Sequence, residues 1–172
     1  MNNSINATVG IIGNVVGILT HEDGSQEVFT TKNIVTSSGD LHYAQCSMGQ
    51  TPTINYKIAP AGIRLGSGST TPAKSDTTVT TYLTGTTHAI DATYPRTADP
   101  DAGNTGSGTT TCTWRYSYTT AEGNAIGIRE GAIVNNTTTP TACLSHFVFP
   151  AAFTKTTSDT FVLYVNNLFL GA

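Results

Sequence analysis

The stretch TTTCTWRYSYT, residues 109–119, decides the fold class of this chain. Cys112, Trp114, Tyr116 and Tyr118 recur at every second position, with small or polar residues and one arginine between them. A period of two is the pattern of a β-strand that turns one face toward a core. Each large aromatic side chain buries on the order of 150–250 Å². The pattern therefore predicts a core strand with Trp114 mostly buried.

Further apolar runs flank this stretch, separated by short polar turns. Residues 9–20 and 26–36 surround Asp23-Gly24, a dipeptide that favours a tight hairpin turn because glycine accepts positive φ. Residues 160–170 are apolar on both faces, which predicts a central strand or a strand covered by a partner. Other strands are predicted at 53–65, 77–83, 125–134 and 142–149.

Helical periodicity is nearly absent from the chain. The one predicted helix covers residues 41–47, with Asp40 as its N-cap and Gly49 at its end. Residues 88–108 contain two prolines, three aspartates and three glycines, so we expect a long surface loop there.

These elements predict an all-β domain, either a β-sandwich or a jelly-roll-like fold, with at most one short helix. Residues 1–36 are predicted to form an N-terminal arm and β-hairpin, and residues 37–172 the sandwich, in one compact unit. An arm can add a strand to the sheet of a neighbouring protein, although an ordinary hairpin within the domain is an equal alternative. The candidate partner contacts are the apolar residues of this region: Val9, Ile11, Ile12, Val15, Ile18 and Phe29.

The composition excludes several classes of function. Only 11% of the residues are charged, against about 25% in average proteins, and the eight Lys and Arg are scattered. We therefore expect no nucleic-acid partner, since phosphate binding needs clustered basic residues. No apolar run approaches the ~20 residues of a membrane helix, so we also expect no membrane association. The first residues, MNNSINAT, lack the basic and apolar regions of a secretory signal.

Acidic residues offer the first candidates for catalysis. Two of Asp91, Asp99, Asp101 and Glu122 could in principle form an acid/base pair, but their surroundings in the sequence contain nothing apolar that would raise a carboxyl pKa. We expect solvated loop acids. Residues 99–110 resemble a calcium loop only faintly, because positions 6 and 12 lack the required Gly and Glu.

Histidine, cysteine and serine give no catalytic pattern either. His21, His42, His88 and His146 stand alone, and we expect hydrogen-bonded sheet or loop residues rather than ligands. Cys46, Cys112 and Cys143 form no CxxC pair, and we expect them to be small, buried, reduced residues. No GxSxG motif is present. The sequence therefore predicts a protein that is not an enzyme, needs no metal or cofactor, and meets other proteins through its surface.

A carbohydrate-binding adhesin is an alternative from another class, because aromatic rings can stack on sugars. The stacking candidates are Tyr82, Tyr94, Trp114, Tyr116 and Tyr118.

Five blocks of the sequence resemble a family of small virion proteins of tailed bacteriophages. The most specific block, IRLGSGSTTPAKSDTTV at 63–79, is similar to a G-x-G-x-T-x-P-x-x-x-D-T-x-L motif of that family. The last block is similar to the ending F-x-x-x-x-K-x-x-x-D-T-x-x-x-x-W/Y-x-L. That last block is SHFVFPAAFTKTTSDTFVLYVNNLFL at 145–170. The three remaining blocks are KNIVTSSGDLHYAQ at 32–45, TCTWRYSY at 111–118 and IGIREGAIVNN at 126–136.

The resemblance implies a structural component of a phage particle, without catalytic residues. It favours a decoration (cement) protein that is made in the host cytoplasm, binds the major capsid protein on the outside of the capsid, and forms a homo-oligomer, with a trimer as the first guess. Small subunits on a shell gain from such multivalent contact. A tail, collar, neck or fibre component stays an alternative, although a fibre is expected to show sequence repeats and none is evident.

Overall fold

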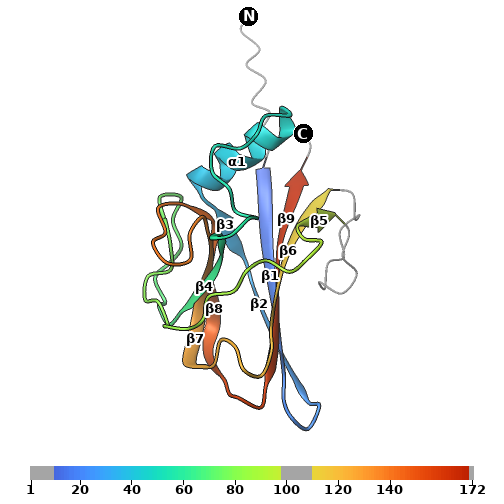
Figure 1. The fold of residues 1–172 in the computed structure, drawn as a ribbon, viewed down its shortest axis with the longest axis vertical. Helices are drawn as coiled ribbons and strands as arrows, with labels where there is room; N and C mark the ends of the chain where they lie inside the picture. The colour runs from blue at the N-terminus through green and yellow to red at the C-terminus, as the bar shows by residue number, and fades with distance from the viewer. Residues whose placement is uncertain (1–9, 98–109, 171–172) are drawn as a thin grey trace, which may run out of the picture.

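The chain forms a sandwich of two antiparallel β-sheets with one helix at one end (Figure 1). The computed structural model describes residues 10–97 and 110–170. Sheet A has the strand order β2-β1-β9-β6-β5, and sheet B has the order β3-β8-β7-β4. The prediction of an all-β sandwich with one short helix is confirmed.

The strands of sheet A are β1 (Gly10–Thr20), β2 (Gln26–Thr31), β5 (Arg96–Thr97), β6 (Thr111–Tyr118) and β9 (Thr160–Leu170). The strands of sheet B are β3 (Asn33–Val35), β4 (Gly62–Gly66), β7 (Ala125–Val134) and β8 (Cys143–Lys155). The helix α1 covers Ser37–Ser47.

The hairpin of β1 and β2 is an integral part of sheet A. Its turn contains Gly24 at a φ of 82°, as Asp23-Gly24 predicts. Strand β1 pairs along its whole length with β9, from Gly10 opposite Leu170 to Thr20 opposite Thr160. Strand β9 in turn pairs with β6, so it is central, as its two apolar faces predict. Strand β1 is therefore interior, and β2 is the edge strand.

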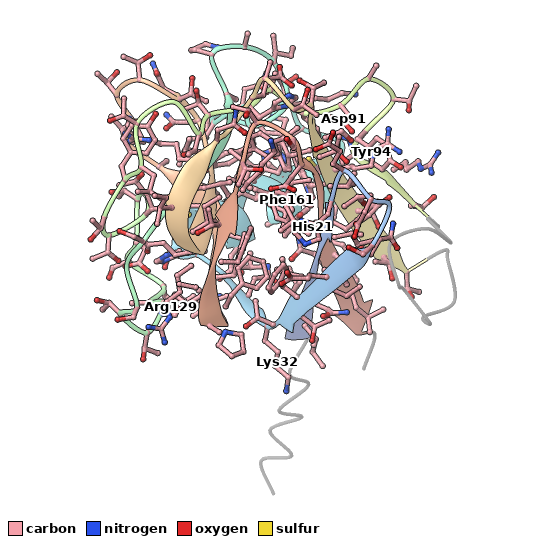
Figure 2. The ribbon with its side chains drawn as sticks, turned by 90° about the horizontal axis from the view of Figure 1, so that it is seen from below. His21, Lys32, Asp91, Tyr94, Arg129 and Phe161 are labelled. Atoms are coloured by element: carbon pink, nitrogen blue, oxygen red, sulfur yellow. The ribbon has the colours of Figure 1, made fainter. Side chains whose placement is uncertain are left out.

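The core lies between the two sheets and is rich in aromatic residues. Trp114, Tyr116 and Tyr118 point inward from β6 and are at most 2% exposed, which confirms the alternation of that strand. Phe161 of β9 lies between the sheets in the view along the sandwich (Figure 2). Sheet B contributes Ile63, Leu65, Ile128, Ile133, Leu144, Phe147, Phe149 and Phe153.

The helix begins earlier than the sequence predicts. Thr36, and not Asp40, is the N-cap: its hydroxyl accepts a hydrogen bond from the Gly39 N–H at 3.1 Å. Asp40 lies within the first turn and pairs with Lys74 instead. Gly39 is required at its position, since a Cβ there would lie 2.1 Å from the carbonyl oxygen of Leu144.

A chain of buried polar groups attaches the helix to the sandwich. The Tyr43 hydroxyl accepts hydrogen bonds from Trp114 Nε1 at 3.0 Å and from Asn167 Nδ2 at 2.8 Å. Asn33 of β3 donates to Asn167 at 2.9 Å, so one chain of contacts links the helix to both sheets. Within the described ranges, α1 is the sole helix, and its eleven residues are too short and too polar for a membrane span.

One predicted strand, at 53–65, is too long, and another, at 77–83, is wrong. Residues 53–61 form turns, in which the Asn55 side chain accepts from the N–H groups of Lys57 and Ile58, so the strand is limited to Gly62–Gly66. Residues 77–83 make one isolated bridge, between Gly66 and Tyr82. In both segments apolar residues are buried without a hydrogen-bonded ladder, which alternation alone does not distinguish from a strand.

The predicted hairpin run 26–36 is divided between the two sheets, because Gln26–Thr31 forms β2 in sheet A and Asn33–Val35 forms β3 in sheet B. The remaining predicted elements differ only in their ends. Strand β7 has the predicted bounds, whereas β8 continues past residue 149 to Lys155. The predicted loop at 88–108 contains the short strand β5, and its residues 98–109 lie outside the described ranges.

Candidate interaction surfaces and a buried polar cluster

The outer surface of sheet A carries apolar side chains on three adjacent strands. Ile18 lies between Val28 of β2 and Val162 of β9, and Val16 lies beside Tyr164 in the next row. Val28 is 60% exposed and Ile12 is 49% exposed. We call this surface the outer apolar face. It comprises Ile12, Val16, Ile18, Val28, Val162, Tyr164 and Leu168, of which Val16 and Tyr164 are only 6% exposed.

The outer surface of sheet B is covered by the chain itself. Val79 and Tyr82, from the segment after β4, pack on Ala132, Val134 and Cys143 in a second small core. The two sheets therefore differ: the segment after β4 covers sheet B around Ala132 and Val134, although Ile126 at the start of β7 is 80% exposed, whereas the β1–β2 side of sheet A leaves both Ile12 and Val28 open to solvent. Exposed apolar residues in a contiguous group indicate an interaction surface more often than scattered ones do.

The β6 side of sheet A is covered by the segment that leads into β5. Asp91 accepts from Arg115 Nε at 2.6 Å and from the Ser117 N–H at 3.0 Å. The guanidinium of Arg115 lies 4.6 Å from the ring centroid of Tyr94, which is buried. Asp91 and Tyr94 lie together at this side of the sandwich (Figure 2). The open part of sheet A is thereby limited to the β2–β1–β9 side.

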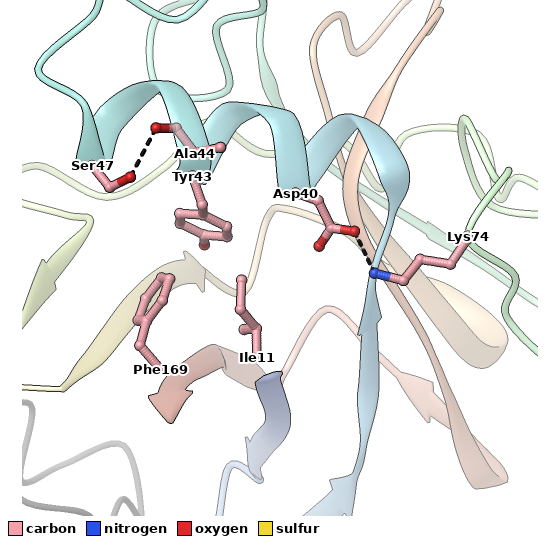
Figure 3. A pocket seen from close by; sticks show the side chains of 7 residues that line it. All are labelled: Ile11, Asp40, Tyr43, Ala44, Ser47, Lys74 and Phe169. Carbon is pink, nitrogen blue, oxygen red and sulfur yellow. Dashed lines mark hydrogen bonds and ion pairs between the residues drawn. The ribbon is translucent and has the colours of Figure 1, made fainter. Parts of the chain in front are cut away.

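A groove of about 600 Å³ lies between α1 and the ends of β1 and β9 (Figure 3). Tyr43 and Phe169 meet edge to face, 5.0 Å between ring centroids, and Ile11 points toward them from β1. At the other side, Asp40 accepts from Lys74 Nζ at 2.6 Å, with both side chains about half exposed. The groove thus joins an apolar wall to a charged rim.

The candidate partner contacts separate into three groups. Ile12 and Ile18 lie on the outer apolar face, and Ile11 lines the groove. Val15 is 0% exposed and Phe29 packs on the core, which excludes Val15 as a surface contact. Val9 lies outside the described residues.

A buried cluster of two acids and one imidazole lies on the outer side of sheet B. Glu130 of β7 is fully buried, and its Oε2 lies 3.0 Å from His146 Nε2. His146 Nδ1 lies 2.7 Å from Asp76 Oδ2. We call these three residues the Glu130 cluster. It fixes the segment after β4, since Glu130 also accepts from the N–H groups of Gly68, Thr80 and Thr81.

The hydrogen bonds set the charges of the Glu130 cluster. Burial alone would raise the pKa of Glu130, but the bonds from His146 and from the backbone N–H groups outweigh it and lower this pKa to about 2. Burial also disfavours the His146 imidazolium, yet the two carboxylates outweigh it and raise its pKa above the ordinary value. Both imidazole nitrogens then donate, and His146 is charged between two carboxylates.

The geometry of the Glu130 cluster favours a structural role. A catalytic triad needs an imidazole nitrogen that is free to take a proton from a nucleophile, and here both nitrogens face carboxylates. His146 stands alone in the sequence, so the cluster was not predicted. One signal was present: Glu130 interrupts the apolar strand IREGAIV, and a charged residue in such a strand needs a partner.

A second histidine connects the hairpin to the turn before β9. His21 Nδ1 lies 2.8 Å from Asp159 Oδ1, and its Nε2 lies 3.1 Å from Glu27 Oε1. Both bonds raise the pKa of His21, and the bond to Asp159 has the larger effect. Hydrogen bonds from the N–H and the hydroxyl of Thr156, and with a smaller effect from His21, lower the pKa of Asp159 to about 2. His88 and His42 instead make hydrogen bonds to backbone carbonyl oxygens.

The remaining candidates for chemistry do not assemble into a catalytic site. Asp91 is committed to Arg115 and Ser117, and Glu122 accepts from the N–H and hydroxyl of Thr119. Asp99, Asp101 and the rest of the faint calcium loop up to residue 109 lie outside the described residues. Among the residues that are described, no three His, Cys, Asp or Glu are arranged to hold a metal ion.

The aromatic candidates for sugar stacking are largely inside the protein. Trp114, Tyr116, Tyr118 and Tyr94 are at most 2% exposed. Tyr82 is half-buried, and the Arg64 guanidinium lies 3.7 Å from its ring centroid. Rings in these positions present no open platform for a sugar, and the adhesin hypothesis loses its candidate residues.

Comparison with protein-family models, with curated proteins and with solved structures finds no match to this chain. The resemblance to phage virion proteins therefore rests on the five sequence blocks alone.

Proposed function

We propose that this protein is a non-enzymatic structural component of a tailed bacteriophage particle. In this proposal it is a decoration protein on the capsid exterior that binds the major capsid protein and stabilises the shell. The outer apolar face is the observation that carries the proposal. An apolar surface that spans three adjacent strands, with Ile12 and Val28 exposed, suits a large protein partner better than a small substrate.

The surface chemistry supports binding to an assembled shell. Val28 and Ile12 supply the exposed apolar groups, and threonines such as Thr20 and Thr30 surround them on the same strands. Hydroxyl groups form hydrogen bonds with a smaller desolvation cost than charged groups do. A weak contact of this kind becomes strong when a homo-oligomer, such as a trimer, binds several shell subunits at once.

A tail or neck component is the second candidate, and the free edge of sheet A favours it. Strand β2 pairs only with β1, so its outer edge can accept a strand from a neighbouring subunit in a ring. Copy number separates the two roles, because a shell carries decoration subunits by the hundred and a tail or neck ring carries only a few.

The test adds the purified protein to shells that lack it and measures binding and the temperature of shell breakage. We expect bound protein and a higher breakage temperature. Ile12→Lys and Val28→Lys place a charge on the outer apolar face and should each weaken binding at least ten-fold, a loss of about 1.4 kcal/mol.

Ile126→Lys is the matched control, since Ile126 is 80% exposed on β7 of the other sheet. It should bind as the wild type does. Absence of binding by the wild type refutes the decoration role, and equal binding by all three variants refutes the assignment of the face.

A further inference from the structure

Cys46 and His42 form a pair on one face of α1. They lie one helical turn apart, a spacing that places two side chains next to each other. The distance between Cys46 Sγ and His42 Nε2 is 3.8 Å, and the Cys46 side chain is exposed. The expectation that all three cysteines are buried is therefore wrong for Cys46.

The surroundings of His42 determine which nitrogen faces the thiol. His42 Nδ1 lies 3.1 Å from the carbonyl oxygen of Ile54. A carbonyl oxygen only accepts, so Nδ1 carries the hydrogen, and Nε2 presents its lone pair to Cys46. Burial lowers the pKa of His42, against a smaller opposing effect of the Ile54 carbonyl, so the ring is held in the neutral form, in which Nε2 can accept a proton. Edge contacts with Tyr43 and Tyr56 fix the ring orientation.

A pocket of about 280 Å³ opens beside the thiol. It is lined mainly by apolar side chains, including Trp114, Pro52 and Pro95, with Lys57 among the polar residues. This volume accommodates a small substituent on the sulfur atom. A nucleophile, a base held by a third group, and space for the incoming molecule are the parts of a reactive-thiol site.

The other two cysteines lack these features. Burial is the main cause that raises the pKa of Cys112, to about 11, and burial also raises the pKa of Cys143. Both thiols therefore stay protonated at neutral pH, and reactivity requires the thiolate.

We propose that Cys46 is a modification site, at which His42 takes the thiol proton and the sulfur reacts with small disulfides. In this exchange the Cys46 sulfur attacks one sulfur of the disulfide, a new S–S bond forms, and the old S–S bond breaks. The leaving thiolate then receives the proton that His42 took. The small disulfide is the oxidant, so the reaction is balanced without another reagent.

The test follows the reaction of the native protein with dithiodipyridine at neutral pH, with mass spectrometry to locate the modified cysteine. We expect one fast thiol, at Cys46, that reacts about ten-fold faster than the thiols of the same chain unfolded in urea. His42→Ala should slow Cys46 about ten-fold. Leu41→Ala, an exposed neighbour on the same helix, should leave the rate unchanged.

Three results would contradict the proposal, the first two for the reactive thiol and the third for its base. The first is a fast thiol that maps to Cys112 or Cys143. The second is a native Cys46 that reacts no faster than the thiols of the urea-unfolded chain, a comparison that stands even if the His42 variant does not fold. A His42→Ala variant that folds and keeps the wild-type rate would show that His42 does not act as the base.

Discussion

Replacement of Glu130 by Gln is the most informative test of the buried polar cluster. The substitution keeps the size of the side chain and removes one acceptor oxygen. In the native protein Oε1 accepts from the N–H groups of Gly68 and Thr81 at 2.9 and 2.7 Å. Oε2 accepts from Thr80 and from His146 Nε2. Whichever way the new amide is turned, its NH₂ group faces at least two donors.

The cost follows from these contacts. A buried donor without an acceptor costs about 1–3 kcal/mol, and here two donors lose theirs. The His146 imidazolium also loses a charged partner in a fully buried position, and loss of one member of a buried ion pair costs about 3–5 kcal/mol. We therefore expect Glu130→Gln to lower the free energy of unfolding by about 3–5 kcal/mol, against a total of about 5–15 kcal/mol for a typical domain.

The assay is urea unfolding at neutral pH, followed by the fluorescence of Trp114, the only tryptophan and a buried one. Glu22→Gln makes the same chemical change at an exposed position in the hairpin turn and should cost less than about 0.5 kcal/mol. A cost below about 1 kcal/mol for Glu130→Gln would refute the view that this carboxylate fixes the segment after β4.

Two further predictions concern pH and the start of the helix. The raised pKa of His146 means that its contribution to stability is complete below about pH 6.5 and is lost as the pH rises through the folded-state value. The lowered pKa of Glu130 gives the opposite dependence, with stability lost as the pH falls from about 4.5 toward 2, so urea unfolding should show a maximum between these two limits. Gly39→Ala places a methyl group against the Leu144 carbonyl and should cost about 1–3 kcal/mol in thermal or urea unfolding, whereas Ser37→Ala, exposed in the same turn, should cost less than about 0.5 kcal/mol.

The sequence predicts those parts of the fold in which local pattern and burial agree. Strand β6 alternates strictly and buries its aromatic face, and β9 is apolar on both faces and central. The 77–83 segment is a part of the chain whose structure the local sequence pattern does not predict. Val79 and Tyr82 both cover the outside of sheet B although they are three positions apart, and the N–H groups of Thr80 and Thr81 between them donate to Glu130, so the segment is a loop.

The candidate sites were less predictable, because they depend on pairs of residues that are distant in the sequence. His146 and Asp76 are 70 positions apart, and His21 and Asp159 are 138 apart. Each histidine taken alone gives the interpretation of an ordinary sheet or loop residue. Cys46 and His42 are close in the sequence, and both lie within the helix that was predicted to start at residue 41. The role of Ile54, however, depends on a turn that was predicted as a strand.

The two histidine contacts and the uncovered sheet belong to one physical pattern. Although only 11% of the residues are charged, two histidine–carboxylate groups connect parts of the chain that are distant in the sequence. One group fixes the cover of sheet B, and the other fixes the hairpin end of sheet A. The β2–β1–β9 side of sheet A is stabilised by complete strand pairing instead, and it keeps Ile12 and Val28 exposed without any internal cover. A surface that is rigid before contact loses little conformational entropy on binding, so an apolar side chain there contributes more of its burial energy to a complex. If the proposed function holds, we therefore expect the partner to contact sheet A, with sheet B on the side away from it.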